Sequence, residues 1–335
     1  MAEPRAATLL VTGATGFVGR HVVAALQDAG YTDIRCLTHH RAADASALAR
    51  GVELVAGDVR DPESLDRAMA GVELLVHLVA IIRERPGGVT FLSVNHLGTR
   101  NVVEAARKAG VRHMVHQSAV GADPDPGRRY SRSKWLGEQE VIGGGVPYTI
   151  LRPSIIFGGG DEFLNTLAAV VKLFPVAPIA GGGRNRFQPI AVQDVARCLV
   201  QAASQEEYIG RTVEIGGPRQ YTYDQIVGLL IQALGVRRKL VHVPVGPMRL
   251  IAGAMEAVLA RPPVTREQLK YLDIDNVAQG ESVEAEFGFT PKPLEESLGY
   301  IRDLGWREAL AINLGRTPRR LREQGVLAPE QSSSD

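Results

Sequence analysis

The sequence has few cysteines, few aromatic residues and no long apolar run. Its 335 residues include two cysteines, Cys36 and Cys198, and 5% of the residues are aromatic. Two distant cysteines without metal-ligand spacing argue against a disulfide framework and against a zinc or iron–sulfur site. No stretch approaches ~18 uninterrupted apolar residues, so we expect no transmembrane helix.

An excess of charge of one sign is also lacking. The 38 Lys and Arg residues nearly balance 37 Asp and Glu residues, which gives no electrostatic reason to expect nucleic acid as a partner. Met1 to Arg5 lead into the first apolar run without the long apolar core of a signal peptide. With 45% apolar residues the chain can bury a large core. We therefore expect a soluble protein of the cytoplasm.

A glycine-rich stretch lies where the apolar run Leu9 to Val11 gives way to a helical pattern. Gly13 permits a tight turn, Gly16 lets backbone N–H groups approach a phosphate, and Gly19 allows close packing of helix and strand. The helix N-terminus adds partial positive charge. This context favours a dinucleotide pyrophosphate site over a purely structural turn. The candidate residues of this turn are Gly13, Thr15, Gly16, Phe17, Val18, Gly19 and Arg20.

The second expected strand, Ile34 to Leu37, ends without an acidic residue. A carboxylate there would hold the adenosine 2′-hydroxyl of NAD, whereas a basic residue suits the 2′-phosphate of NADP. Arg20 follows the third glycine, and His39 and Arg41 follow the strand. We therefore expect NADP(H) rather than NAD(H). The alternative is that Arg20, His39 and Arg41 are solvated surface cations.

Strands alternate with helices through the first half of the chain. Further strands are expected at residues 53–58, 74–79, 114–117 and 148–151, with helices between them. This alternation predicts an α/β fold, a Rossmann-type doubly wound parallel sheet with helices on both faces. Ligands of such sheets bind beyond the carboxyl ends of the strands. Asp58 lies at such an end, where it could accept a hydrogen bond from an adenine amino group.

The pattern loosens after residue 155, where glycine triplets and prolines are frequent. We expect residues 1–155 to form an NAD(P)-binding domain with returning segments near 185–217. Residues 156–315 are expected to form mainly a smaller, partly discontinuous substrate-side domain. Residues 316–335 are expected to be a tail with a disordered end.

Met248 to Leu259 is an apolar stretch with helical character, bounded by prolines. A core or lid helix is the favoured interpretation. Because so few charges interrupt the stretch, a contact with a partner or with a membrane surface is the alternative.

A possible catalytic site follows the fifth expected strand. Ser118 ends that strand, and Tyr130 precedes Lys134 by four residues. On a helix this spacing places the phenol and the ammonium on one face. A free tyrosine has a pKa of about 10, and a nearby buried ammonium favours the phenolate, which suits general acid–base catalysis. Ser118 could bond the substrate oxygen that Tyr130 protonates. Singly, each residue also has an ordinary structural explanation.

The glycine turn, Asp58, Ser118 and the Tyr130/Lys134 pair together resemble the short-chain dehydrogenase/reductase superfamily in its extended and atypical branches, which includes NAD-dependent epimerases and dehydratases. The stretches Asn95 to Val102 and Leu151 to Gly158 match it in order. More narrowly, several stretches are similar to bacterial relatives of the NAD(P)H-binding accessory subunit of respiratory complex I. They are Ser118 to Ala122, Arg152 to Gly158 and Pro263 to Leu269.

The resemblance implies roles for individual residues. Tyr130 would be the catalytic acid/base, Lys134 would orient the nicotinamide ribose and lower the tyrosine pKa, and Ser118 would hold the substrate. Two departures are visible: Ser118 lacks the superfamily's doubled serine, and His39 replaces a more basic residue. The positions that the resemblance places around the cofactor are Asp58, Val59, His77, Leu78, Val79, Ala80, Asn95, Pro153 and Ile156.

Three functions remain open at this point. The first is an NAD(P)-dependent oxidoreductase or epimerase acting on a small or lipid-linked carbonyl or alcohol. The second is an accessory subunit or redox sensor that holds NADPH without turnover. The third, a nucleotide-sugar epimerase, would need a basic pocket, for which Arg184, Arg186 and Arg211 are candidates. An oligomer is possible by analogy with the superfamily.

Overall fold

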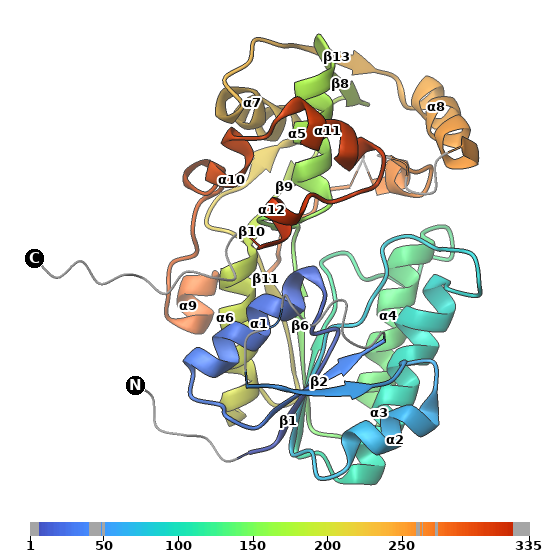
Figure 1. The fold of residues 1–335 in the computed structure, drawn as a ribbon, viewed down its shortest axis with the longest axis vertical. Coiled ribbons are helices and arrows are strands. Elements are labelled where there is room, and N and C mark those ends of the chain that lie inside the picture. Colours follow the sequence, from blue (N-terminus) through green and yellow to red (C-terminus); the bar gives the residue numbers. More distant parts are fainter. Residues whose placement is uncertain are drawn as a thin grey trace, which may run out of the picture. The chain divides into compact units, whose positions relative to one another are not determined.

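The computed structural model describes residues 7–39, 48, 51–258, 262, 264–271 and 274–323. The chain divides into two compact units (Figure 1). The first comprises Met1–Pro153, Val192–Ile215 and Gln279–Glu281, and the second comprises Ser154–Ala191, Gly216–Ala278 and Ser282–Asp335. The chain therefore crosses between the units several times.

The first unit is built on a parallel sheet of seven strands in the order β11-β6-β5-β4-β1-β2-β3. The strand order reverses direction at β1, whose neighbours β2 and β4 lie on opposite sides. This is the point where open α/β sheets bind ligands. The strands are β1 (Leu9–Thr12), β2 (Ile34–Thr38), β3 (Glu53–Ala56), β4 (Leu74–His77), β5 (His113–Gln117), β6 (Tyr148–Pro153) and β11 (Arg211–Ile215).

Helices cover both faces of this sheet (Figure 1). One layer contains α1 (Phe17–Asp28) packed on α6 (Val192–Ser204). The other contains α2 (Pro62–Met69), α3 (Leu97–Ala109) and α4 (Arg129–Gly143), with the π-helical turn η2 (Leu92–His96) before α3. The 3₁₀ turn η3 (Glu206–Tyr208) follows α6 and precedes β11. The predicted doubly wound α/β fold is confirmed.

The helix and strand limits follow local sequence signals, with small shifts. Gly110 ends α3 with a positive φ of 72°, as its position predicts. Asp61 is the N-cap residue of α2 with Pro62 behind it, but its side chain makes no capping hydrogen bond. Strand β3 ends at Ala56, so Asp58 lies beyond the strand rather than in it. Both cysteines are free and buried.

The second unit is made of helices and short strand pairs around a separate core. Its core residues include Leu164, Ile179, Ile226, Leu230 and Ile301. The strands pair as β10 with β7, β12 with β9 and β13 with β8. They are β7 (Ile156–Phe157), β8 (Val176–Ala180), β9 (Arg186–Phe187), β10 (Ile190–Ala191), β12 (Tyr221–Thr222) and β13 (Lys239–Val243).

The longest helix of the second unit is α8, and only Ala252 of it is buried. Of the favoured interpretation, a core or lid helix, the core part is therefore wrong and the lid part stays a prediction; Leu259 lies outside the described residues. In the predicted tail, residues 319–323 are helical and 324–335 lie outside the described residues. The helices are α5 (Phe163–Leu173), α7 (Tyr223–Ala233), α8 (Val245–Val258), α9 (Val283–Phe287), α10 (Gly299–Arg302), α11 (Trp306–Asn313) and α12 (Arg319–Glu323), with 3₁₀ turns η4 (Gln268–Tyr271) and η5 (Leu294–Glu296).

Asp161 holds the second unit together at the start of α5. Its carboxylate accepts hydrogen bonds from the backbone N of Gly158, Leu164 and Asn165, from Asn165 Nδ2 and from Tyr300 Oη. Burial raises the pKa of this carboxyl to about 6, although the three backbone donors and Tyr300 oppose that shift. The carboxylate thereby connects α5 to α10.

We predict that Asp161→Ala lowers the free energy of unfolding by about 1–3 kcal/mol, because buried donors are left without an acceptor. Urea unfolding followed by circular dichroism measures the change. The control Glu281→Ala removes an exposed carboxylate and should alter stability by less than about 0.5 kcal/mol. Equal stability of the Asp161→Ala variant and the wild type would contradict the assignment.

Candidate functional site

The residues predicted to bind the cofactor and substrate gather where the parallel strands end. Gly13 follows β1, His39 follows β2, Asp58 lies just past β3, Leu78 follows β4 and Ser118 follows β5. Because these strands are parallel and adjacent, their carboxyl ends form one edge of the sheet. The first unit thus presents the predicted site along a single edge.

The glycine turn leaves no room for side chains at two of its positions. Gly13 has a φ of +77°, and a Cβ there would lie 3.2 Å from the backbone of Leu78 and Val79. A Cβ on Gly19 would lie 2.1 Å from Gly13 O and 2.7 Å from Ala14 Cα. The first turn of α1 therefore packs directly on the glycine turn. Gly16 is exposed at the N-cap of α1, where backbone N–H groups favour an anion.

Arg20 and His39, which we expected to favour NADP, differ in their surroundings. Arg20 is 5% exposed and its guanidinium lies over the Phe17 ring at 5.6 Å, so the interpretation of Arg20 as a solvated surface cation is wrong. His39 Nε2 lies 2.8 Å from Asp58 Oδ2. Arg41 lies outside the described residues.

Asp58 is an ionised carboxylate held by two basic side chains. Arg60 donates from Nε to both carboxylate oxygens at 3.1 Å and from Nη2 at 2.6 Å. Burial alone would raise the pKa of Asp58, but the Arg60 hydrogen bonds and the Arg60 and His39 charges hold it at about 2. The sequence analysis missed Arg60, because an arginine two residues after an aspartate carries no distinctive motif.

Lys134 is the buried cation of the site. Its side chain is 2% exposed and Nζ donates to the Gln117 carbonyl oxygen at 2.7 Å. Burial lowers the pKa of Lys134 to about 8, although the Glu138 charge opposes that shift. The ammonium is thus fixed at the end of β5, beside Ser118.

Ser118 follows β5 directly after Gln117, and Tyr130 lies one helical turn before Lys134 on α4. The Ser118 side chain is 3% exposed, and its Oγ makes no hydrogen bond with any described residue. Tyr130 is half-buried in the first turn of α4, four residues before Lys134, with its ring 5.8 Å from that of Phe91 in an edge-to-face contact. A buried hydroxyl without a partner is what a substrate-binding group looks like before a ligand arrives.

Two buried histidines lie near Lys134: His77, which the resemblance placed near the cofactor, and His116, which the sequence analysis did not select. His77 and His116 stack with ring centroids 5.1 Å apart. Burial and then the Lys134 charge lower the pKa of His77 to about 3 and that of His116 well below its ordinary value. His77 lies between the hydroxyls of Thr12 (2.7 Å) and Thr99 (3.1 Å). Both imidazoles are therefore neutral, so they add no second positive charge beside Lys134.

Asn95 fixes the helix that carries Tyr130. Its Oδ1 accepts from Ile81 N at 2.8 Å, and its Nδ2 donates to Ile81 O and to Ser133 Oγ, both at 3.0 Å. Ser133 Oγ in turn donates to Tyr130 O at 2.7 Å. Asn95 lies in the π-helical turn η2, a geometry that is frequent at functional sites. Asn95 thus connects the loop after β4 to the start of α4.

A buried ion pair anchors the same helix farther along. Arg152 of β6 donates to both carboxylate oxygens of Glu138, at 2.8 and 2.6 Å. Glu138 is fully buried and Arg152 also reaches Glu214 of β11 at 3.4 Å. The Glu138 carboxylate thus has two donors from Arg152, while Lys134 Nζ donates to the Gln117 carbonyl oxygen.

The remaining predicted positions are placed as follows. Thr15 and Val18 are half-buried in the glycine turn and the start of α1, and Ala80 is exposed after β4. Val59 belongs to the apolar core of the first unit. Pro153 is the last residue of β6, whereas Ile156 lies in β7 of the second unit.

The three arginines proposed for a second pyrophosphate have different surroundings. Arg211 is the first residue of β11, at the opposite end of that strand from the predicted site, and its guanidinium lies over the Tyr208 ring. Arg186 is paired with Asp275 at 2.8 Å, and Arg184 is exposed. The nucleotide-sugar interpretation stays a prediction.

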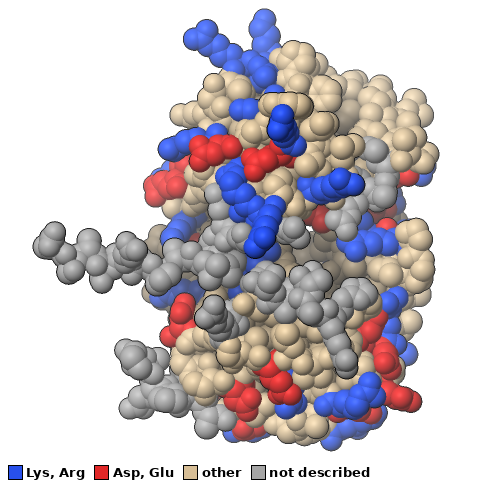
Figure 2. Space-filling view, viewed as in Figure 1, with Lys and Arg blue, Asp and Glu red and all other residues tan. Residues whose placement is uncertain are grey.

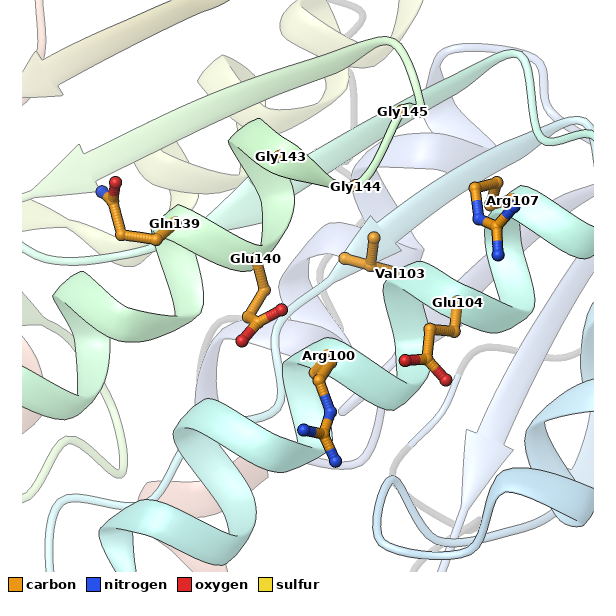
Figure 3. A pocket seen from close by; sticks show the side chains of 9 residues that line it. All are labelled: Arg100, Val103, Glu104, Arg107, Gln139, Glu140, Gly143, Gly144 and Gly145. Atoms are coloured by element: carbon orange, nitrogen blue, oxygen red, sulfur yellow. The ribbon is translucent and has the colours of Figure 1, made fainter.

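A cavity of about 440 Å³ lies between α3 and α4 but does not contain the predicted site (Figure 3). Charged side chains of both helices line it, together with three glycines at the end of α4. Gly143 lies 13 residues after Tyr130 on α4, which corresponds to about 20 Å along a helix. The lining residues are Arg100, Val103, Glu104, Arg107, Gln139, Glu140, Gly143, Gly144 and Gly145.

The fold and the strand-end residues define a dinucleotide-binding protein of the short-chain dehydrogenase/reductase class. Residues 9–216 match the model of the NAD dependent epimerase/dehydratase family, and the chain belongs to that family. The resemblance stated from the sequence is confirmed.

The relatives of the chain include both an enzyme and respiratory subunits. It is 33% identical to ceramide reductase of Caulobacter vibrioides over 257 residues, which cover 76% of this chain and 79% of that protein. It is 26% identical to the mitochondrial NADH dehydrogenase [ubiquinone] 1 alpha subcomplex subunit 9 of Arabidopsis thaliana over 278 residues, 80% of this chain and 68% of that one.

Among solved structures, the chain is similar to the dTDP-glucose 4,6-dehydratase DesIV of Streptomyces venezuelae, determined with NAD bound. The TM-score is 0.69 at 22% identity, covering 88% of this chain and 95% of that chain. At this identity the likeness shows the fold.

We predict that Gly19→Ala weakens dinucleotide binding at least about tenfold, because the added Cβ displaces the glycine turn. Isothermal titration with NADPH and NADH measures the affinity. The control Gly143→Ala adds a methyl group in open space on α4, and binding should stay within about twofold of the wild type. Unchanged binding by the Gly19→Ala variant would contradict this role of the turn.

Proposed function

We propose that the chain is an NAD(P)-dependent oxidoreductase that interconverts a carbonyl and an alcohol on a small or lipid-linked substrate. One observation carries this proposal: the buried Lys134 ammonium donates to the carbonyl oxygen of Gln117, the residue before Ser118, and Tyr130 precedes Lys134 by one turn on α4. The similarity of this chain to the ceramide reductase of Caulobacter vibrioides supports a lipid-linked substrate.

The glycine turn fits a dinucleotide. Because Gly13 and Gly19 have no Cβ, the turn packs closely against the backbone after β4 and against the first turn of α1. The N-terminus of α1 favours the pyrophosphate. These residues would hold the phosphates, with Asp58 on the adenine side. When bound, the nicotinamide ring supplies or accepts the hydride.

The residues of the chain then handle the substrate oxygen and its proton. Ser118 Oγ donates a hydrogen bond to that oxygen, and Tyr130 Oη gives the proton during reduction or removes it during oxidation. The Lys134 ammonium stabilises the negative charge that Tyr130 acquires when it gives up the proton. Asn95 acts as a positioning residue, because its hydrogen bonds hold the helical turn that carries Tyr130.

A second function has its own support. Several relatives are NADH dehydrogenase subunits, including the one from Neurospora crassa at 27% identity over 279 residues. An accessory protein that holds NADPH without turnover would keep the glycine turn and would need neither Tyr130 nor Ser118. The presence of Ser118, Tyr130 and Lys134 together favours the oxidoreductase.

We predict that Tyr130→Phe lowers kcat by about 10²- to 10⁴-fold while cofactor affinity stays within about threefold, because only the proton donor is lost. Steady-state assays of NADPH oxidation with carbonyl substrates, together with a binding titration, measure both values. The control Tyr148→Phe changes a half-buried tyrosine at the amino end of β6 and should retain activity. Full activity in the Tyr130→Phe variant would contradict the catalytic assignment. Tightly held cofactor without turnover in the wild type would favour the accessory function.

The pKa of Lys134 predicts an alkaline limit on activity. The ammonium is the protonated form, so its population falls as the pH rises through about 8. We expect kcat/KM to fall about tenfold per pH unit above that value. Measurement from pH 6 to pH 10 tests this, and a flat profile up to pH 10 would show that the ammonium is not required.

Preference for NADP(H) over NAD(H) remains part of the proposal. It is supported by the absence of an acidic residue at the end of β2, where Thr38 is the last residue of the strand and His39 follows it, and by Arg41 in the sequence. We predict that Arg41→Ala weakens NADPH binding about tenfold more than NADH binding, because only NADPH carries the 2′-phosphate. Titration of both dinucleotides measures the ratio, and equal losses would show that Arg41 does not contact that phosphate.

A further inference from the structure

Helix α8 of the second unit exposes an apolar face. Leu250 is 78% exposed, Ile251 49% and Val258 83%, and Pro247 and Ala254 are exposed as well. The spacing of these five residues by three and four positions places them along one side of the helix. We call them the α8 face. On a water-soluble surface such a row of large aliphatic side chains marks a binding site.

The opposite side of α8 is accounted for by packing within the unit. Ala252 and Met248 pack against Ala180 of β8, Leu269 and Val264. Glu256 is paired with Arg266 at 2.7 Å. The α8 face is therefore the side that the described fold leaves uncovered, and Glu256, the one acidic residue of the helix, is already neutralised.

Cationic and further apolar side chains lie on the strand pair that adjoins α8. Strand β13 leads into α8, and it begins with the exposed Lys239, which pairs in register with Val176 and is preceded by the exposed Arg237. We call Arg237 and Lys239 the cationic edge. Figure 2 shows Lys and Arg side chains projecting from the end of this unit that contains β13, and a surface almost free of charged side chains over α8. Val176 of β8 and Val241 of β13 are 39% and 42% exposed, and Phe174, which follows α5 just before β8, is 51% exposed.

We propose that the α8 face and the cationic edge dock the protein on the surface of an anionic lipid bilayer. The aliphatic side chains enter the boundary between headgroups and acyl chains, while the cations bind the anionic headgroups. Charge selects this occupant, since the cationic edge flanks the apolar surface without an unpaired acidic side chain on α8. No described helix is long and apolar enough to cross a membrane, and the 14 residues of α8 span only about 21 Å, so the helix lies in the plane of the surface.

Sedimentation with lipid vesicles tests the docking of the full chain. Vesicles of two parts phosphatidylcholine to one part phosphatidylglycerol should bind the wild type, and vesicles of pure phosphatidylcholine should bind it at least about tenfold more weakly. Leu250→Ser with Ile251→Ser should lower the partition coefficient about tenfold or more, and Arg237→Glu with Lys239→Glu by a similar factor. Val258→Asp provides an independent change at the far end of the α8 face.

Two matched double variants serve as controls. Leu54→Ser with Ile142→Ser removes aliphatic side chains that are 44% and 46% exposed in the first unit. Arg67→Glu with Lys108→Glu makes the same change in net charge at exposed positions of that unit. Both should bind vesicles as the wild type does. All variants should bind the dinucleotide normally, because the glycine turn lies in the first unit.

Three results would overturn the proposal. The first is a wild type that binds neither kind of vesicle. The second is equal vesicle binding by the wild type, the Leu250→Ser/Ile251→Ser variant and the Val258→Asp variant. The third is a wild-type dimer in sedimentation velocity that the same variants convert to a monomer, which would make the α8 face an interface between copies. The Tyr130→Phe variant should bind vesicles normally, so failure of docking and failure of the proposed chemistry are distinguishable.

Discussion

The burial of the Lys134 ammonium is the constraint on which the candidate site depends. A lysine that is 2% exposed loses nearly all its contact with water, which is costly unless its charge finds fixed partners. The Gln117 carbonyl at 2.7 Å is the partner that the structure provides. Burial also brings the pKa of the ammonium close to the pH at which enzymes work.

The surroundings of Lys134 keep that arrangement in place. Arg152 binds Glu138 through two hydrogen bonds, which fastens α4 to β6 and neutralises the carboxylate one turn away. His77 and His116 lie near Lys134 as neutral imidazoles, so they do not repel its ammonium group. Asn95 ties the first turn of α4 to the loop after β4. These contacts come from different strands and helices, so the doubly wound sheet is what brings them together.

The sequence predicts those parts of the site that depend on local pattern. The glycine turn, the strand ends at Asp58 and Ser118 and the Tyr130/Lys134 spacing can each be recognised from short stretches of sequence. Arg60 and His116 could not be selected in this way: an arginine two residues after an aspartate forms no motif, and His116 acts on partners far apart in the chain. A polar residue within an otherwise apolar strand was the available signal for His116.

The second unit shows the same division between local pattern and tertiary context. The apolar stretch around Met248 predicts a helix, and the structure has one. Hydrophobicity favoured burial, whereas the structure exposes Leu250 and Val258. Burial depends on which neighbouring elements reach the helix, and the described residues pack only against its Ala252 and Met248 side. The sequence alone carries no signal for that choice.

The most direct measurement is the pKa of Lys134 itself. The chain has six lysines, so carbon-13 lysine labelling with single substitutions assigns each ε-carbon signal; they are Lys108, Lys134, Lys172, Lys239, Lys270 and Lys292. We expect one signal to titrate near pH 8 and to be missing in the Lys134→Arg variant. Titration of all six lysines above pH 10 would show a solvated Lys134 and would contradict a site built around a buried cation.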